Sequence, residues 1–375
     1  MAKVTLGEVA MEARETCKGD RSGFHTVGLE HITPGEIRLS EYDVGSDNTF
    51  TKRFHEGDIL FGRRRAYLKK AAIAPFEGIC SGDITVIRAI QDKMEPRLLP
   101  FVIQNDDFFD FAVGRSAGSL SPRVKWEHLK TYSFELPEMD KQRELADVLW
   151  AIEDTRAAYQ ELAAAMEELV KSRFVEMFGD PVTNPMGWEI KSLSDMGDYK
   201  NGMNFHKGEN GVELHCLGVG DFQNLSIIDD TSTLPIISLN DKPSKEYLLQ
   251  NDDIVFVRSN GNKNLVGRCL AVYPNEIPTV FSGFCIRFRL AAKEQLTIGY
   301  LLQVLKHESM RQRMTGRGAN IQNLNQQILS RLDIPLPPLA LQNEFAAFVE
   351  QVDKSKFDQL GRSSSCLMKT ILRKK

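Results

Sequence analysis

The sequence lacks any long apolar segment. None of its 375 residues belongs to an uninterrupted apolar run of about 18, and the opening MAKVTLGEVA has no apolar core of the kind found in secretory signals. Neither membrane insertion nor secretion is therefore predicted. We expect a cytoplasmic protein with no membrane partner.

Clusters of cysteine and histidine are also missing. The six cysteines contain no C-x-x-C pair, and no two of the seven histidines lie three or four residues apart. Such scatter argues against a disulfide framework and against a zinc site formed by neighbouring residues. We expect reduced, mostly buried thiols and no bound metal.

Sequence fingerprints of catalysis are few. The chain has no G-x-x-x-x-G-K-[ST] phosphate loop and no H-E-x-x-H motif. The G-x-G element at 218–220 lacks a third glycine, and the Glu-Ile-Lys at 189–191 has no paired acidic motif before it. The Asn/Asp-Pro-Pro-aromatic tetrapeptide with which amino-methyltransferases hold their target amine is absent as well. We expect neither catalysis nor a bound cofactor in this chain alone.

An internal repeat is present at an offset of 200 residues. Leu-Pro followed by Gln-x-Glu occupies 136–144 and again 336–344. Each copy continues with apolar residues at the 0, 3, 4, 7 spacing of an amphipathic helix face. The spacing predicts that each copy ends in a helix.

Shorter similarities lie upstream of these helices. GDILF at 57–61 resembles DDIVF at 252–256, and CSGDI from residue 80 resembles FSGFC from residue 281. Short buried strands bounded by turns explain both pairs, and 375 residues exceed what one core usually serves. We predict two related mixed α/β domains. The predicted segments are a first domain at 1–137, a central helix at 138–179, a second domain at 180–337 and a distal helix at 338–375.

The central helix is predicted to run unbroken from about 140 to 178, because this stretch is rich in alanine and has no glycine or proline. At 1.5 Å per residue it would be roughly 58 Å long, too long for one compact domain to cover. Two repeats related by a pseudo-twofold axis would pack their helices antiparallel, as a coiled-coil spacer between the domains. The alternative is that each helix docks on its own domain. The distal helix is expected to be interrupted at Gly361 to Ser365.

Charge is unevenly distributed in a chain whose net charge is −4. Residues 138–178 hold ten acidic and five basic side chains, whereas 52–70 hold seven basic and two acidic ones. Binding of a polyanion such as DNA depends more on a local patch of positive charge than on the net charge of the whole chain. The acidic helix is better suited to a protein partner than to phosphate.

Two clusters in each predicted domain combine side chains suited to DNA, one after a buried strand and one before the Leu-Pro step. Arginine can pair with guanine and asparagine or glutamine with adenine, whereas lysine and serine suit phosphates. The alternative is solvated or helix-capping loops; recurrence of the first cluster in both copies favours function. The predicted DNA-binding residues are Arg63, Arg64, Arg65, Tyr67, Lys69, Lys70, Arg115, Ser116, Ser119, Arg123, Lys125, Arg258, Asn260, Asn262, Lys263, Arg317, Asn320, Gln322, Asn323 and Asn325.

These motifs together resemble a known family. Two α/β domains, each followed by a Leu-Pro step and a Gln-x-Glu that opens a helix, with Gly-Trp-Glu at 187–189 introducing the second, are similar to the DNA-specificity (S) subunit of type I restriction-modification systems. The resemblance covers essentially the whole chain. The second copy matches better, because the first has Glu138-Met139 where a second proline and a leucine are usual.

The resemblance implies a non-catalytic, sequence-specific DNA-binding subunit. Each globular domain would be a target-recognition domain for one half of a bipartite site in double-stranded DNA, and the paired helices would set the gap between the halves. The helices would also dock two modification (methyltransferase) subunits, which bind S-adenosylmethionine and methylate adenine. Restriction subunits would join such a complex to cut DNA.

Two other functions remain open from the sequence. One is a helix-mediated protein scaffold without DNA, which predicts no salt-dependent DNA binding. The other, with less support, is a self-sufficient DNA enzyme, which methyl-transfer or cleavage assays on the lone chain would reveal.

Overall fold

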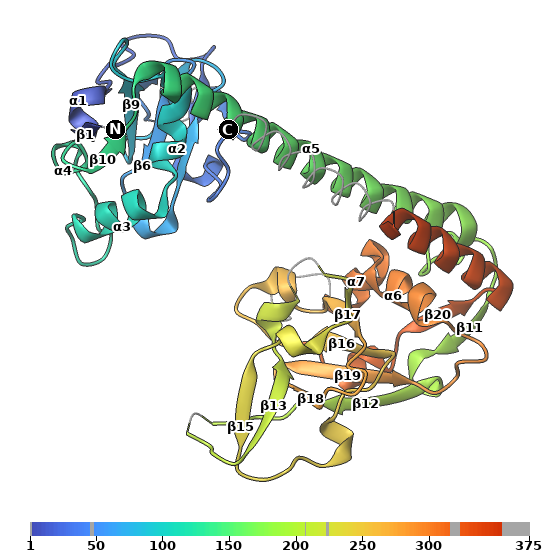
Figure 1. The fold of residues 1–375 in the computed structure, drawn as a ribbon. Coiled ribbons are helices and arrows are strands. Elements are labelled where there is room, and N and C mark those ends of the chain that lie inside the picture. Colours follow the sequence, from blue (N-terminus) through green and yellow to red (C-terminus); the bar gives the residue numbers. More distant parts are fainter. Residues whose placement is uncertain (1, 46–48, 207, 223–224, 316–322, 355–375) are drawn as a thin grey trace. The chain divides into compact units, whose positions relative to one another are not determined.

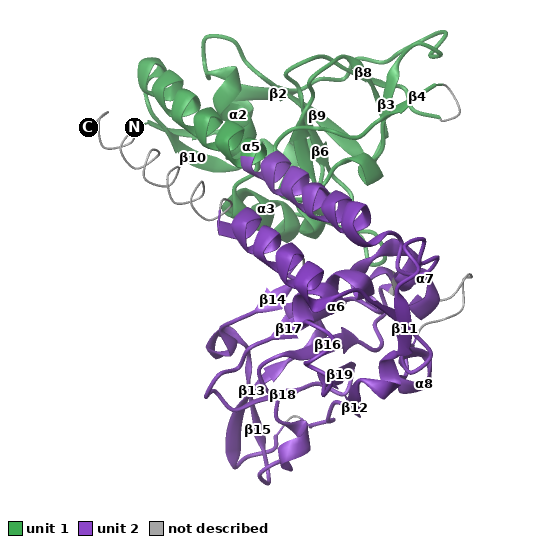
Figure 2. Cartoon of the chain, turned by 90° about the vertical axis from the view of Figure 1, so that its right-hand side faces the viewer, with its two compact units in different colours: residues 1–158, 367–375 green, residues 159–366 purple. Residues whose placement is uncertain are grey.

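The computed structural model describes residues 2–45, 49–206, 208–222, 225–315 and 323–354 (Figure 1). These residues form two compact units: unit 1 extends to Ala158, and unit 2 begins at Tyr159 (Figure 2). Within those ranges, no helix is long and apolar enough to cross a membrane.

Unit 1 combines two small sheets with short helices. Its elements are β1 (Ala2–Thr5), α1 (Leu6–Val9), β2 (Ala10–Glu12), β3 (His25–Val27), β4 (Asp43–Val44), β5 (Lys52–Phe54), β6 (Ile59–Gly62), β7 (Ala71–Ile73), β8 (Gly78–Cys80), β9 (Ile84–Ala89), α2 (Leu99–Ile103), α3 (Asp106–Gly114), α4 (Trp126–Leu129), β10 (Ser133–Leu136) and the first part of α5 (Met139–Phe178). One sheet has the order β2-β9-β6-β7 and the other β4-β3-β8-β5, while β1 pairs with β10. Only the β3–β8 pairing is parallel among these described strands.

Unit 2 is built in the same way. Its elements after α5 are β11 (Glu189–Ser192), β12 (Gly197–Asn201), β13 (Val212–Leu217), β14 (Ile227–Ile228), β15 (Ile236–Leu239), β16 (Asp253–Val257), β17 (Cys269–Val272), β18 (Thr279–Phe281), β19 (Cys285–Leu290), α6 (Ile298–Lys306), α7 (Glu308–Thr315), α8 (Gln326–Leu329) and β20 (Asp333–Leu336). The sheets have the orders β12-β19-β16-β17-β14 and β15-β13-β18, and β11 pairs with β20. Residues 339–354 are helical.

The two units share one topology. The order β2-β9-β6-β7 corresponds to β12-β19-β16-β17, and the parallel pairing of β3 with β8 corresponds to that of β13 with β18. Unit 2 adds β14 at one edge, and β5 of unit 1 has no described counterpart. The prediction of two related mixed α/β folds is confirmed, and the CSGDI and FSGFC repeats are the turns that join β8 to β9 and β18 to β19.

Successive side chains of the central strands point to opposite faces of the sheet and so contribute to two different hydrophobic cores. In β6, Ile59 and Phe61 belong to a core that includes residues of α2 and α3, whereas Leu60 between them belongs to the core on the side of the second sheet. In β16, Ile254 and Val255 are divided between two cores in the same manner. A strand buried on both faces has no polar side, so these strands are continuously apolar. Phe108 and Phe109 are buried in α3.

A buried aspartate begins the central strand region of each unit. Asp58 accepts two hydrogen bonds of 2.7 Å from Arg88, and Asp253 accepts two of the same length from Arg289. The aspartates are 1% and 0% exposed. Because a buried carboxylate needs a paired cation, this bidentate contact explains why Asp recurs before the apolar strand. The hydrogen bonds that Arg289 donates to Asp253 raise the pKa of Arg289.

The glutamine of the repeated Gln-x-Glu motif anchors each helix to its own domain. Gln142 accepts a hydrogen bond from the backbone N–H of Glu95 (2.9 Å) and donates to the carbonyl of Pro137 (2.8 Å). Gln342 accepts from the N–H of Thr297 (2.9 Å) and donates to the carbonyls of Gln295 and Pro337 (2.9 and 2.8 Å). Both amides are buried, so the motif recurs because a neutral side chain with one acceptor and two donors fits both places.

Gln342→Ala is expected to destabilise unit 2 by about 1–3 kcal/mol, because buried backbone groups lose their partners. Urea unfolding should show a lower midpoint than for the unsubstituted chain. Asn343→Ala, at the exposed neighbouring position of the same helix, is the matched control and should leave the midpoint nearly unchanged. Equal effects of the two substitutions would contradict the anchoring role.

The uninterrupted central helix is confirmed: α5 has 40 residues. Its first half packs on unit 1, where the Trp150 indole N–H donates to the carbonyl of Arg97 (2.8 Å) and Arg156 pairs with Glu36 (2.8 Å). The helix ends at Phe178. The following residue, Gly179, has a φ of +75°, and a Cβ added to it would lie 2.5 Å from the Pro185 ring. Glycine is therefore the residue that fits this terminus.

The last turns of α5 pack within unit 2. The rings of Phe174 and Phe178 both lie 5.6 Å from that of Phe345, and Arg173 pairs with Glu344 at 3.2 Å. The helix at 339–354 therefore contacts α5, and the two lie side by side in Figure 2. Phe345 also belongs to the core of unit 2, so this helix docks on its own domain as well. The predicted interruption at 361–365 lies outside the described residues.

Candidate nucleic-acid interface

The two basic clusters predicted in the first domain form one surface. The loop after β6 is bonded to the loop before α4, because the N–H of Val124 donates to the carbonyl of Arg63 (2.9 Å) and that of Arg65 to the carbonyl of Pro122 (2.8 Å). Arg64 and Arg123 form an isolated antiparallel bridge between the same loops. Side chains 60 residues apart are thus presented together.

Unit 2 repeats this pairing at equivalent positions. The N–H of Leu324 donates to the carbonyl of Arg258 (2.8 Å), as Val124 does to Arg63, and Ser259 bridges to Asn323. We call these paired loops the first and second loop pairs: 63–70 with 114–125, and 258–263 with the described part, 323–325, of the second cluster. Arg317, Asn320 and Gln322 lie outside the described residues.

A third segment, which sequence reasoning missed, completes the first loop pair. The β8–β9 turn places the Asp83 carboxylate 2.8 Å from Arg123 Nε and 3.3 Å from Arg64 Nη1, and Arg64 Nη2 also donates to Ser121 Oγ (3.1 Å). The hydrogen bond from Arg123 lowers the pKa of Asp83. The recurring Ser-Gly at 81–82 and 282–283 was the available signal for this turn.

The basic residues after β6 differ in exposure and in bonding. Arg65 and Tyr67 are exposed on a 3-10 turn, Ala66–Leu68, whose flanking residues Arg65 and Lys69 have left-handed φ values of 54° and 51°. Lys69 forms an ion pair with Asp106. Lys70 donates to the carbonyl of Leu29 (2.5 Å), a bond within the fold. Arg65 and Tyr67 are therefore the more accessible of these candidates.

The loop after α3 carries the remaining candidates of unit 1. Arg115 lies 5.4 Å from the centre of the Phe111 ring, while Ser119 and Lys125 are exposed. Ser116 occupies the middle of Gly-Arg-Ser-Ala-Gly, the spacing of a hydrolase nucleophile elbow, but it follows a helix and donates to the carbonyl of Ala112 (2.9 Å). A nucleophile elbow requires a strand-to-helix turn, so Ser116 is better explained as a residue that caps the end of the preceding helix than as a nucleophile.

In unit 2, several candidates have local structural bonds. Asn260 and Asn262 each accept a hydrogen bond from the backbone N–H two residues ahead (2.7 and 3.1 Å), and Arg258 donates to the carbonyl of Gly283 (3.3 Å). Asn325 caps α8 by accepting from the N–H of Ile328 (2.8 Å), which is the capping alternative considered from the sequence. Asn323 is exposed, and Lys263 opens the 3-10 turn that follows.

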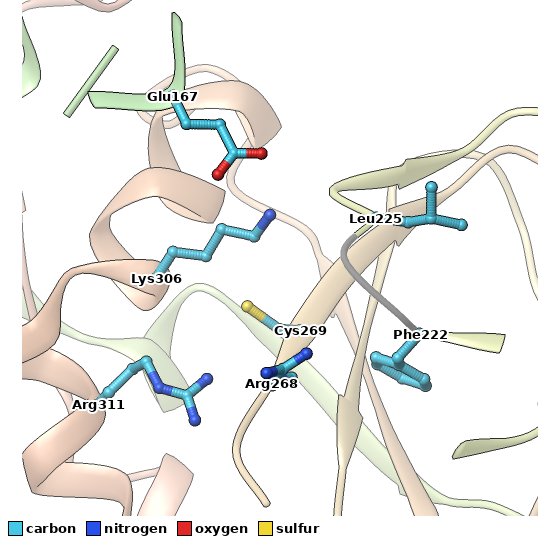
Figure 3. Close-up of a pocket in the computed structure, with 7 residues that line it drawn as sticks. All are labelled: Glu167, Phe222, Leu225, Arg268, Cys269, Lys306 and Arg311. Atoms are coloured by element: carbon cyan, nitrogen blue, oxygen red, sulfur yellow. The ribbon is translucent and has the colours of Figure 1, made fainter. Parts of the chain in front are cut away.

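Another basic feature of unit 2 is a cavity of about 320 Å³ (Figure 3). It is lined by Glu167, Phe222, Leu225, Arg268, Cys269, Lys306 and Arg311. Burial lowers the pKa of Lys306 and that of Arg311. These cations already bond protein groups: Lys306 donates to Ser226, and Arg311 to the carbonyls of Asn264 and Val266. The loop pairs are therefore the stronger candidate interface.

Thiol and metal chemistry are weakly supported within the described ranges. Those ranges hold five unpaired cysteines, four of them buried, and burial raises the pKa of Cys80 and that of Cys216 to about 12. They contain no group of three or more His, Cys, Asp or Glu side chains placed to hold a metal ion.

A sequence profile described as the type I restriction modification DNA specificity domain matches the chain twice, at residues 5–167 and 185–362. These matches cover well over half of the 375 residues, and the chain belongs to this family. The resemblance drawn from the repeated Gln-x-Glu and Leu-Pro motifs is confirmed.

Individual relatives are more distant. The chain is 25% identical over 253 residues to the type I restriction enzyme StySPI specificity subunit of Salmonella potsdam, covering 62% of this chain and 54% of that one, so the match spans about half of the relative. It is 23% identical over 391 aligned positions to the putative type I restriction enzyme MjaX specificity subunit of Methanocaldococcus jannaschii (94% and 87%). The crystal structure of a type I S subunit from M. genitalium has the same fold, with a TM-score of 0.56 at 13% identity over 100% of this chain and 94% of that one.

Proposed function

We propose that this chain is the DNA-binding specificity subunit of a cytoplasmic type I restriction-modification complex and that each unit recognises one half of a bipartite target. The observation that carries the proposal is the recurrence of a loop pair at equivalent positions of two units with one topology. In each, an Arg-containing loop after the central strand is bonded to a second polar loop. Base edges and phosphates are contacted by such side chains, whereas an unrelated surface loop has no reason to recur in this form.

We further propose that α5 and the distal helix run antiparallel and set the spacing between the half-sites. The contacts of Phe345 with Phe174 and Phe178, together with the Arg173–Glu344 pair, support this arrangement at the base of the helices. A 40-residue helix is about 60 Å long, on the scale of the distance between two separated half-sites. The proposed parts are residues 1–137, 138–179, 180–337 and 338–375.

The charge of α5 suits a protein partner, and the family to which the chain belongs implies which subunits these partners are. Its acidic side chains include Glu161 and Glu168, both exposed, and such a surface repels phosphate but can dock protein. We propose that two modification subunits bind the helices and supply S-adenosylmethionine and methyl transfer. Restriction subunits add cleavage, and this chain itself is non-catalytic.

DNA binding by the chain assembled with its modification subunits tests the proposal. The logarithm of the binding constant should fall linearly with the logarithm of salt concentration, as expected when phosphate counterions are released, and it should depend on sequence. Methylation mapping of host DNA should then return a bipartite motif. Assembly without salt-dependent DNA binding would favour a protein scaffold, and methyl transfer or cleavage by the chain alone would favour an enzyme.

Two substitutions in the first loop pair should have different signatures. Arg64→Ala is expected to cost about 1–3 kcal/mol on the target and to relax discrimination at one position, if its guanidinium contacts a base. Lys125→Ala, at an exposed position of the second loop, should weaken all sequences alike and reduce the salt slope by about one. Competition binding with single-base variants of the mapped target measures both, and equal losses on every sequence for Arg64→Ala would count against base contact.

A further inference from the structure

Asp83 bridges the two arginines of the first loop pair. Its carboxylate accepts from Arg123 Nε (2.8 Å) and Nη2 (3.4 Å) and from Arg64 Nη1 (3.3 Å), so three segments distant in sequence converge on one acidic side chain. The Asp83 side chain is 22% exposed, whereas those of Arg64 and Arg123 are 39% and 45% exposed. The acid is therefore more covered than either arginine, although Nε of Arg64 is itself buried.

The bonding leaves donors available on both arginines. A guanidinium has five N–H donors. Arg64 uses one hydrogen of each Nη for Asp83 and Ser121, and Arg123 uses Nε and one hydrogen of Nη2. The second hydrogen of each Arg64 Nη, the second hydrogen of Arg123 Nη2 and the whole Nη1 group of Arg123 remain for a ligand, whereas Arg64 Nε is buried without a partner. Fixing the side chains beforehand removes rotamer entropy that recognition would otherwise cost.

Unit 2 lacks both the acid and the two arginines at the equivalent positions. At the equivalent turn, Phe284 replaces Asp83, and this residue is 57% exposed. At the positions equivalent to Arg64 and Arg123, unit 2 has Ser259 and Asn323. An acid is thus found in this turn only in the unit whose paired loops carry two adjacent cations. A purely structural need of the turn would not depend on those partners.

We propose that Asp83 is a positioning residue of the first recognition domain, which holds Arg64 and Arg123 in the orientation that distinguishes one DNA sequence from another. The proposal rests on the DNA-binding function proposed above. Asp83 increases discrimination and lowers overall affinity, because its hydrogen bonds fix the donors while its negative charge opposes phosphate. Guanine is the base that two fixed arginines suit, since each can pair with its O6 and N7.

The test uses Asp83→Asn in the chain assembled with its modification subunits and the DNA target found by methylation mapping. Affinity for unrelated DNA is expected to rise roughly threefold at moderate salt, because one negative charge is removed from the interface. The preference for the target over single-base variants should fall by about tenfold or more at positions in one half-site and stay unchanged in the other. Asp83→Glu, which keeps the charge, should return the affinity for unrelated DNA to its original value and restore part of the preference.

Asp110→Asn is the matched control, because it removes the same charge from an exposed position of α3 in the same unit. It should change affinity for unrelated DNA in the same direction without altering the preference, and thermal unfolding checks that both variants are folded. The proposal is overturned if Asp83→Asn leaves the preference at the Asp110→Asn value, or if it weakens every sequence equally. A wild-type complex without sequence preference would instead overturn the proposed function itself.

Discussion

Exchanging the first recognition domain for that of another specificity subunit is expected to change one half of the methylated motif and to leave the other half intact. The reason is that each loop pair is formed within one unit, by backbone bonds such as those of Val124 with Arg63 and of Leu324 with Arg258. Each unit also has its own hydrophobic cores. Methylation mapping of cells that carry the chimaera provides the readout.

The position of the junction matters for this exchange. A junction at residue 137 separates Trp150 from Arg97 and Arg156 from Glu36, whereas one placed after Arg156 keeps these contacts with the domain to which they belong. The chimaera with the later junction should therefore be the more stable of the two. The reciprocal exchange of 180–337 is the control and should alter only the other half-site. A change in both halves from either exchange would contradict separate recognition.

Lengthening both helices should lengthen the spacer of the target without altering its half-sites. Four residues inserted near Ala164 of α5 and four after Lys354 lie at matching levels if the helices are antiparallel, because Phe174 faces Phe345. Four residues add about 6 Å along a helix, which corresponds to one or two base pairs at roughly 3.4 Å each. The mapped motif should thus gain one or two unspecified base pairs.

Insertion into α5 alone is the informative control for the spacer prediction. It would place the apolar stripes of the two helices out of register, and each apolar side chain that loses its partner forfeits about 1.5–3 kcal/mol. Lower stability and weaker methylation are therefore expected, without a new defined spacer. If the double insertion left the spacer unchanged, the helices would not set it.

The sequence predicted the elements that depend on local pattern. The repeated Leu-Pro and Gln-x-Glu motifs located two related domains, and alanine without glycine or proline over residues 140–178 predicted α5 almost to its ends. These features are recorded in neighbouring residues, through helical spacing and through turn residues at strand ends. The pairing order of the strands was not predicted, since it is set by contacts between residues far apart in sequence.

The candidate interface was predicted in part. Both basic loops of each unit were chosen by composition, but their pairing through Val124 and Leu324 was not, and neither was the role of Asp83 between Arg64 and Arg123. Composition also could not separate a side chain that faces solvent from one that bonds the fold. Tyr67 is exposed, whereas Asn325 caps a helix, and their residue types give no warning of the difference.

The anchoring glutamines have a consequence for how such a chain can diversify. Gln142 bonds the main chain of residues 95 and 137, and Gln342 bonds that of residues 295, 297 and 337. Amide groups of the main chain are the same whatever side chains surround them. The joint between helix and domain can therefore accept a domain of new sequence without redesign, which would let recombination shuffle specificities while the architecture of the complex is inherited unchanged.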